Sequence, residues 1–167
     1  MVNILHTFWE DSDEFVNPNP VTDEMIQIAE EKLGYKLPDS YIRLIKSQNG
    51  GTPVQNCFPT TVPTSWAEDH IYVAGFYGIG GEHGIDTEGI YMIEEFEYPS
   101  SCIYVGESPT AGHDAVLLDY SECGKQGEPR VIHVNVENYQ DPIITFLADD
   151  FQTFLQGLLP YFHFDKN

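Results

Sequence analysis

The short connections between the β-rich segments in the second part of the chain limit the possible folds more than any other feature. From Val54 onward, short runs rich in β-branched and aromatic residues are separated by Gly, Pro, Asn and Ser. A parallel crossover needs about a dozen residues or more, and these connections are too short for one. We therefore expect a mainly antiparallel sheet with one face covered by helices. The expected strands are Ile71 to Tyr77, Ile90 to Ile93, Ile103 to Val105, Ala115 to Tyr120 and Val131 to Val136.

Two helices are expected before this region. Thr22 is a suitable N-terminal cap, and apolar residues follow it at helical spacing until Gly34, which favours a left-handed stop. Pro38 then begins a second helix, which Asn49-Gly50-Gly51 ends. The two helices form a hairpin that we expect to pack on the sheet. Their apolar positions are Met25, Ile28, Ala29 and Leu33 in the first helix and Tyr41, Leu44 and Ile45 in the second.

A last helix is expected near the C-terminus, capped by Asp149 or Asp150 and stopped near Pro160. The chain has 167 residues, of which 41% are hydrophobic, so it is long and apolar enough to bury one sizeable core. No repeat or low-complexity segment divides it. We predict a single α+β domain over residues 20–162, with an acidic arm before it (residues 1–19) and a short tail after it (residues 163–167). The helical hairpin and the C-terminal helix, with apolar positions Phe151, Phe154, Leu155 and Leu158, pack on the sheet in this prediction.

Negative charge without nearby positive charge is the main chemical feature of the sequence. Residues 47–124 contain twelve Asp or Glu residues and no Lys or Arg, and the whole chain has a formal net charge of -20. Such an excess keeps a protein soluble or attracts a cationic partner. It would repel DNA or RNA, since a duplex carries a phosphate charge about every 1.7 Å along its axis. We therefore expect a basic protein partner and no direct contact with nucleic acid.

Targeting and redox features indicate a cytoplasmic protein. The N-terminus lacks the basic region, apolar run and cleavage site of a secretion signal. No window approaches the roughly 20 apolar residues that cross a bilayer, and anionic membrane surfaces would repel the chain. The three cysteines, Cys57, Cys102 and Cys123, are odd in number and lack CxxC spacing, which favours reduced thiols. We expect no membrane partner.

The segment from Gly78 to Gly84 superficially resembles a phosphate-binding loop. A dinucleotide fingerprint would have glycine in place of His83 and a helix afterwards, and the charge of Glu82 would oppose an anion. We interpret the segment as a tight turn between strands.

Metal and thiol chemistry have little support in the sequence. A metal site formed by His83, Asp86, His113 and Asp114 would require two loops to meet, and no HExxH or paired short spacing supports it. A cysteine nucleophile paired with a histidine has no local signature, and the apolar surroundings of Cys102 indicate a small buried side chain. We expect no catalytic residue, no metal and no cofactor.

Acids beside aromatic residues are the best candidates for partner binding. Trp66 precedes Glu68 and Asp69, and its indole either anchors a partner within an acidic rim or folds back into the core. The segment Glu94 to Tyr98 places acids and aromatics on opposite faces of an extended segment or loop, or else forms a strand edge that charge protects from aggregation. The predicted partner-binding residues are Trp66, Glu68, Asp69, Glu82, Asp86, Glu94, Glu95 and Glu97.

Three segments together resemble the SUKH superfamily over about Pro20 to Tyr161. They are the hairpin segment Leu37-Pro38-Asp39-Ser40-Tyr41 with its Asn49-Gly50-Gly51 end, the Gly78-Ile79-Gly80-Gly81 turn, and the helix Phe151-Gln152-Thr153-Phe154-Leu155. The resemblance implies an α+β domain that commonly serves as the immunity protein of a bacterial polymorphic toxin, which is a stoichiometric inhibitor and not a catalyst. Many such toxins are nucleases, whose basic grooves an acidic surface would fit. The resemblance also covers eukaryotic regulatory scaffolds, so the fold alone does not choose between these functions.

From these observations we expect a protein that neutralises a cognate toxin with a basic domain, in the first place a nuclease such as an RNase. A regulatory scaffold without a toxin partner is the alternative, and an unrecognised hydrolase is a third. The sequence leaves the oligomeric state open.

Overall fold

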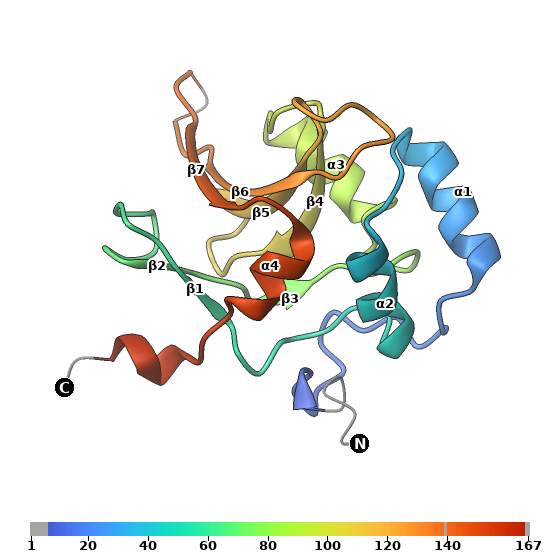
Figure 1. Ribbon diagram of the computed structural model, residues 1–167, viewed down its shortest axis with the longest axis horizontal. Helices are drawn as coiled ribbons and strands as arrows, with labels where there is room; N and C mark the ends of the chain where they lie inside the picture. Colours follow the sequence, from blue (N-terminus) through green and yellow to red (C-terminus); the bar gives the residue numbers. More distant parts are fainter. Residues whose placement is uncertain (1–6, 139, 166–167) are drawn as a thin grey trace.

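The computed structural model describes residues 7–138 and 140–165 and contains two antiparallel sheets. The larger sheet has five strands in the order β3-β4-β5-β6-β7, and the smaller one is a hairpin of two strands (Figure 1). Each pair of neighbours in the larger sheet is antiparallel and consecutive in the chain. Short connections join β4 to β5, β5 to β6 and β6 to β7, as predicted, whereas residues 77–101, which include a helix, connect β3 to β4. The strands are β1 (Cys57–Pro59), β2 (His70–Tyr72), β3 (Gly75–Phe76), β4 (Cys102–Glu107), β5 (Asp114–Asp119), β6 (Arg130–Asn135) and β7 (Ile143–Ala148).

Three predicted caps, at the two ends of the first helix and at the start of the last α-helix, are confirmed. The hydroxyl of Thr22 accepts a hydrogen bond from the backbone N–H of Met25 at 3.2 Å, and Gly34 ends the first helix with φ 82°. The carboxylate of Asp150 accepts a hydrogen bond from the N–H of Thr153 at 2.7 Å. The helices are α1 (Asp23–Leu33), α2 (Asp39–Ser47), α3 (Glu88–Glu95) and α4 (Phe151–Gln156), followed by the 3-10 helix η2 (Tyr161–Phe164).

Aromatic residues join the helical hairpin, the C-terminal helix and the sheet into one core. The ring of Tyr41 on α2 meets Phe151 on α4 edge-on at 5.6 Å between centroids, and Phe151 meets Phe76 on β3 at 6.0 Å. The Tyr41 hydroxyl also donates a hydrogen bond to the carbonyl of Tyr77 at 2.6 Å, so this buried polar group is satisfied. The α+β fold predicted from the sequence is therefore confirmed.

Two predictions about the region after the Gly-rich segment are wrong. The run Ile90 to Ile93 belongs to α3 and not to a strand, and Glu94 to Tyr98 forms the end of that helix and the following turn. Gly89 fits closely against the preceding loop, because a Cβ there would lie 3.2 Å from the carbonyl oxygen of Gly84. A short apolar run does not distinguish helix from strand, and here tertiary packing decides.

Two further differences concern α1 and β7. Ile28 is 54% exposed, whereas its neighbour Ile26 is buried, so the buried face of α1 is centred on Ile26 and Ala29. β7, which pairs with β6 at the border of the sheet, was not predicted from the sequence.

The described part of the N-terminal arm packs on the domain. Phe15 is buried with φ 66°, and its ring fills the space beside Gly75, where a Cβ would come within 2.3 Å of it. The indole N–H of Trp9 donates a hydrogen bond to Ser47 at 3.0 Å. Among the described residues, no helix is long and apolar enough to cross a membrane.

Candidate partner-binding surface

The Gly-rich segment forms the loop between β3 and α3, and not the predicted turn between strands. Gly78 and Gly84 pair across its base. Asp86 is only 9% exposed, and its carboxylate accepts a hydrogen bond from the N–H of Gly80 at 2.8 Å. Although a helix does follow the loop, Asp86 places a negative charge against the backbone donor that an anion would need. Asp86 therefore stabilises the loop and is largely buried, although it was predicted as a partner-binding residue.

Asn49 joins this loop to the end of α2. Its side-chain oxygen accepts a hydrogen bond from the N–H of Ile79 at 2.8 Å, and its amide donates to the carbonyls of Ile79 at 3.0 Å and Asn19 at 2.9 Å. Gly78 has no room for a side chain, because a Cβ would come 2.0 Å from the Asn49 side-chain oxygen. Two segments of the SUKH-like pattern thus contact each other directly.

A polar hollow lies between the loop and the N-terminal arm. We call it the acidic hollow; its volume is about 270 Å³, and three carboxylates line it. Glu82, a predicted binding residue, is exposed here, whereas Asp13 and Glu14 were not among the predicted binding residues. The lining residues are Asp13, Glu14, Phe15, Val16, Asn17, Glu82 and His83.

Two further carboxylates lie close to His83. The Tyr77 hydroxyl is 3.2 Å from Glu88 and 3.1 Å from Glu107, and His83 Nδ1 is 2.6 Å from Glu88. Burial raises the pKa of Glu107 above its ordinary value, and the charges of Glu88 and Glu14 add to the rise, although the hydrogen bond from Tyr77 opposes it. This arrangement creates a negative potential that favours a cationic group. Because Glu88 and Glu107 lie far apart in the sequence, nothing in the sequence indicates that both lie near His83.

Trp66 lies on the surface, in the connection between β1 and β2. Its side chain is 39% exposed and its ring lies 5.3 Å from that of Tyr72, which in turn lies 6.4 Å from Tyr161 on η2. We call these three residues the aromatic surface. Glu68 beside it is exposed, and Asp69 is half-buried with its carboxylate 2.8 Å from Nδ1 of His70. Trp66 therefore does not fold back into the core.

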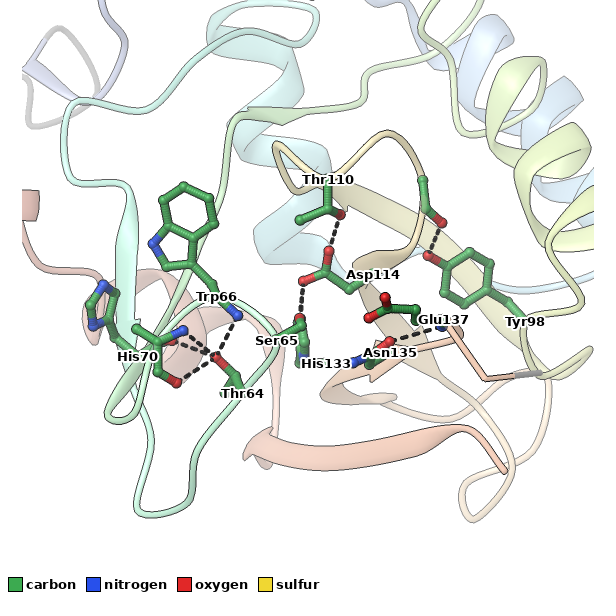
Figure 2. Close-up of polar contacts among 12 residues, drawn as sticks. Thr64, Ser65, Trp66, His70, Tyr98, Thr110, Asp114, His133, Asn135 and Glu137 are labelled. Atoms are coloured by element: carbon green, nitrogen blue, oxygen red, sulfur yellow. Dashed lines mark hydrogen bonds and ion pairs between the residues drawn. The ribbon is translucent and has the colours of Figure 1, made fainter. Parts of the chain in front are cut away.

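The residues before Trp66 hold its loop in place (Figure 2). The Thr64 hydroxyl accepts hydrogen bonds from the N–H groups of Trp66 and Ala67, both at 3.2 Å. The Ser65 hydroxyl donates to the Asp114 carboxylate at 2.8 Å, which fastens the loop to the start of β5. Because its loop is already ordered, Trp66 would lose little conformational freedom on contact with a partner.

Asp114 is the centre of a buried polar network. Its carboxylate is 2.6 Å from Nε2 of His133 and also accepts a hydrogen bond from Thr110. Burial alone would raise the pKa of Asp114, but the hydrogen bonds from His133 and Thr110 outweigh it and hold the pKa below its ordinary value. Ser65 donates to Asp114 and not to His133, so these residues do not form the serine–histidine contact that activates a nucleophile.

The thiol and metal alternatives lack a suitable arrangement in the part of the chain that the structure describes. Burial raises the pKa of Cys57 to about 11 and that of Cys102 to about 12, so both thiols stay protonated at neutral pH. Cys123 is exposed. In residues 7–138 and 140–165, no group of three His, Cys, Asp or Glu side chains could hold a metal ion.

The predicted binding residues fall in three places. Trp66, Glu68 and Asp69 lie on the β1–β2 hairpin, at the left in Figure 1, whereas α3 lies on the right-hand side of the sheet. Glu82 and Asp86 lie in the loop before α3, and Glu94, Glu95 and Glu97 lie at its far end. These last three acids are exposed. A single contact with one partner would therefore not use all of these residues equally.

A sequence model of the SMI1 / KNR4 family (SUKH-1) matches residues 20–157, which is most of the chain. The chain belongs to this family. The SUKH resemblance predicted from the three segments is thereby confirmed. SUKH proteins include immunity proteins, which bind partner toxins, and the family is generally non-catalytic. The search of curated proteins found no match.

Proposed function

We propose that this SUKH protein is an immunity protein that binds and neutralises a cognate bacterial toxin in the cytoplasm. The toxin has a basic domain, in the first place a nuclease such as an RNase. The observation that carries the proposal is an exposed tryptophan, held in an ordered loop, on a family member with a formal net charge of -20. This combination fits a partner with a positive groove and an apolar pocket.

Charge and packing have separate roles in this proposal. The acids of the β1–β2 hairpin, the acidic hollow and α3 attract the toxin from a distance. This attraction raises association rates by roughly 10 to 10³. The aromatic surface forms the desolvated centre of the contact and sets the dissociation rate. A toxin held in this way is blocked because its substrate phosphates and the acidic protein require the same positive groove.

The proposal predicts that a toxin domain is encoded beside the gene for this chain, and it is tested with that domain. Co-expression should restore growth that the toxin alone prevents, and turnover of the toxin's substrate should stop at a 1:1 ratio. Replacing Trp66 with alanine should weaken binding at least about 30-fold, mainly through faster dissociation, because a central anchor contributes about 2 kcal/mol or more. Tyr91→Ala is the matched control, since Tyr91 is an exposed aromatic residue on α3. If the two variants bind the toxin with equal affinity, Trp66 is not part of the interface.

Neutralising the acids of α3 tests the steering role. The triple variant Glu94→Gln, Glu95→Gln and Glu97→Gln should slow association several-fold at low salt and leave dissociation unchanged. The control removes the same charge from exposed acids elsewhere, at Asp11, Glu24 and Glu31. If both triple variants associate more slowly than the unmodified protein and to the same extent, only the total charge matters. If neither variant differs from the unmodified protein, steering by these acids is excluded.

A further inference from the structure

The border strand β7 has an open edge. β7 is the last strand of the five-stranded sheet and pairs only with β6 (Figure 1). Among the described residues, the backbone of Ile143–Ala148 makes no hydrogen bond other than those of its ladder with β6. An edge of this kind presents unpaired N–H and C=O groups that can pair with a strand from another chain.

The side chains of β7 are apolar where those of a protected edge would be charged. Tyr104, Leu117, Ile132 and Phe146 form one row across β4 to β7. The first three are at most 1% exposed, but Phe146, at the end of the row, is 53% exposed and Ile144 is 50% exposed. β7 contains no Lys, Glu, Asp or Pro, which are the usual protection of an edge strand, although its pairing with β6 shifts between Val131 and Ile132.

The charges around β7 indicate what kind of chain would cover it. Residues 131–165 contain no Lys or Arg, and exposed Asp141 and Asp149 lie on either side of the strand. If a second copy paired antiparallel so that Ile144 faced Phe146, Asp141 would face Asp149 at both ends. Like charges in opposite positions destabilise a strand pair. A segment with Lys or Arg at its ends would instead find opposite charge at each end and apolar contacts between them.

We propose that β7 receives an extended segment of the cationic partner as a sixth strand, with basic residues at both ends of that segment. The proposal rests on the proposed function, because the partner is the toxin domain. Backbone hydrogen bonds along β7 would fix the orientation of the partner, and Ile144 and Phe146 would supply the apolar contact. This contact would be separate from the one made by Trp66, which lies on the β1–β2 hairpin.

The test is amide hydrogen exchange of the full chain with and without the adjacent toxin domain. Binding should slow the exchange of amides in β7 at least tenfold. Phe146→Lys should weaken binding at least tenfold by repelling the basic ends, and Phe146→Glu, which loses the same ring but keeps a favourable charge, should weaken it less. Tyr91→Lys is the control for adding a positive charge at an exposed aromatic position. Thermal unfolding of each variant verifies that it is folded.

The outcomes are distinct. If the toxin domain binds and growth is restored, but β7 amides exchange as before and both Phe146 variants bind normally, the strand pairing is wrong and the proposed function stands. If no toxin domain binds, both fail. If the chain alone forms a dimer in sedimentation experiments and Phe146→Lys abolishes it, a second copy occupies the edge and the assignment to the partner is wrong.

Discussion

The charged form of Glu107 opposes folding. It lies half-buried at the end of β4, close to Glu88, and burial raises the pKa of its carboxyl. A carboxyl with a higher pKa in the folded state binds its proton more tightly there than in the unfolded chain. Protonation therefore stabilises the fold fully below the ordinary glutamate pKa of about 4.3, and this stabilisation is lost as the pH rises through the raised value.

Replacing Glu107 with glutamine should therefore raise the free energy of unfolding at pH 7. Glutamine resembles the protonated acid, and its side-chain oxygen still accepts a hydrogen bond from Tyr77. The gain should shrink as the pH falls and disappear below about pH 4. Urea unfolding between pH 4 and 8 measures it, with exposed Glu137 replaced in the same way as the control. A Glu107→Gln variant that is less stable at pH 7 would contradict the sign of the shift.

The roles of some single residues could be predicted from the sequence, and the roles of others could not. The caps at Thr22, Gly34 and Asp150 depend on neighbours within four positions, and all three were predicted correctly. Asp86 was predicted to bind a partner, because nothing in its sequence neighbourhood reveals that its carboxylate turns inward to Gly80. The convergence of Glu14 and Glu107 beside His83 depends on the whole fold.

At the level of elements, the contact between α2 and the Gly-rich loop depends on one side chain. The side chain of Asn49 makes three hydrogen bonds that join the end of α2, the loop and the arm. Removing it would leave the N–H of Ile79 buried without its acceptor, and a buried unsatisfied group costs about 1–3 kcal/mol.

Asn49→Ala should lower the free energy of unfolding by about 2–3 kcal/mol. Urea unfolding at pH 7 measures the change. Asn19→Ala is the control, because the side chain of Asn19 is exposed and only its backbone carbonyl contacts Asn49. Similar stabilities of the two variants would mean that the loop is held by backbone packing, for instance by Gly78, and not by the amide of Asn49.

Elements were predictable where one local pattern was long enough. α1 and α2 had periodic apolar residues and clear ends, and their types were predicted correctly. α3 was not, because its run of apolar residues is short and does not distinguish a helix from a strand. β7 has apolar residues on its exposed positions as well as its buried ones, so the alternation that identifies a half-buried strand is absent.

For the whole molecule, self-repulsion dominates the electrostatics. The formal net charge is -20, and the exposed ion pair Lys46–Asp23 compensates only a small part of it. The total charge follows from the sequence, but its distribution over the β1–β2 hairpin, the acidic hollow and α3 depends on the fold. The screening length falls from about 30 Å at 0.01 M salt to about 8 Å at 0.15 M.

Raising NaCl from 10 to 150 mM should therefore increase the free energy of unfolding, on the order of 1 kcal/mol, because repulsion between the acids is screened. Urea unfolding at the two salt concentrations measures it, and KCl should act in the same way if screening is the cause. A decrease in stability would mean that ion pairs such as Arg130–Asp119 outweigh the repulsion. The same salt should slow association with a basic toxin domain, so stability and binding rate should respond in opposite directions.

The anchoring of Phe15 beside Gly75 affects how the protein can be shortened. Expression of the family-matched region alone, residues 20–157, would omit this ring and open a void next to β3. It would also omit Leu159, whose backbone exchanges two hydrogen bonds with Cys57, so the hairpin that carries Trp66 would lose its support. Truncated versions intended for crystallisation should therefore keep both flanking segments.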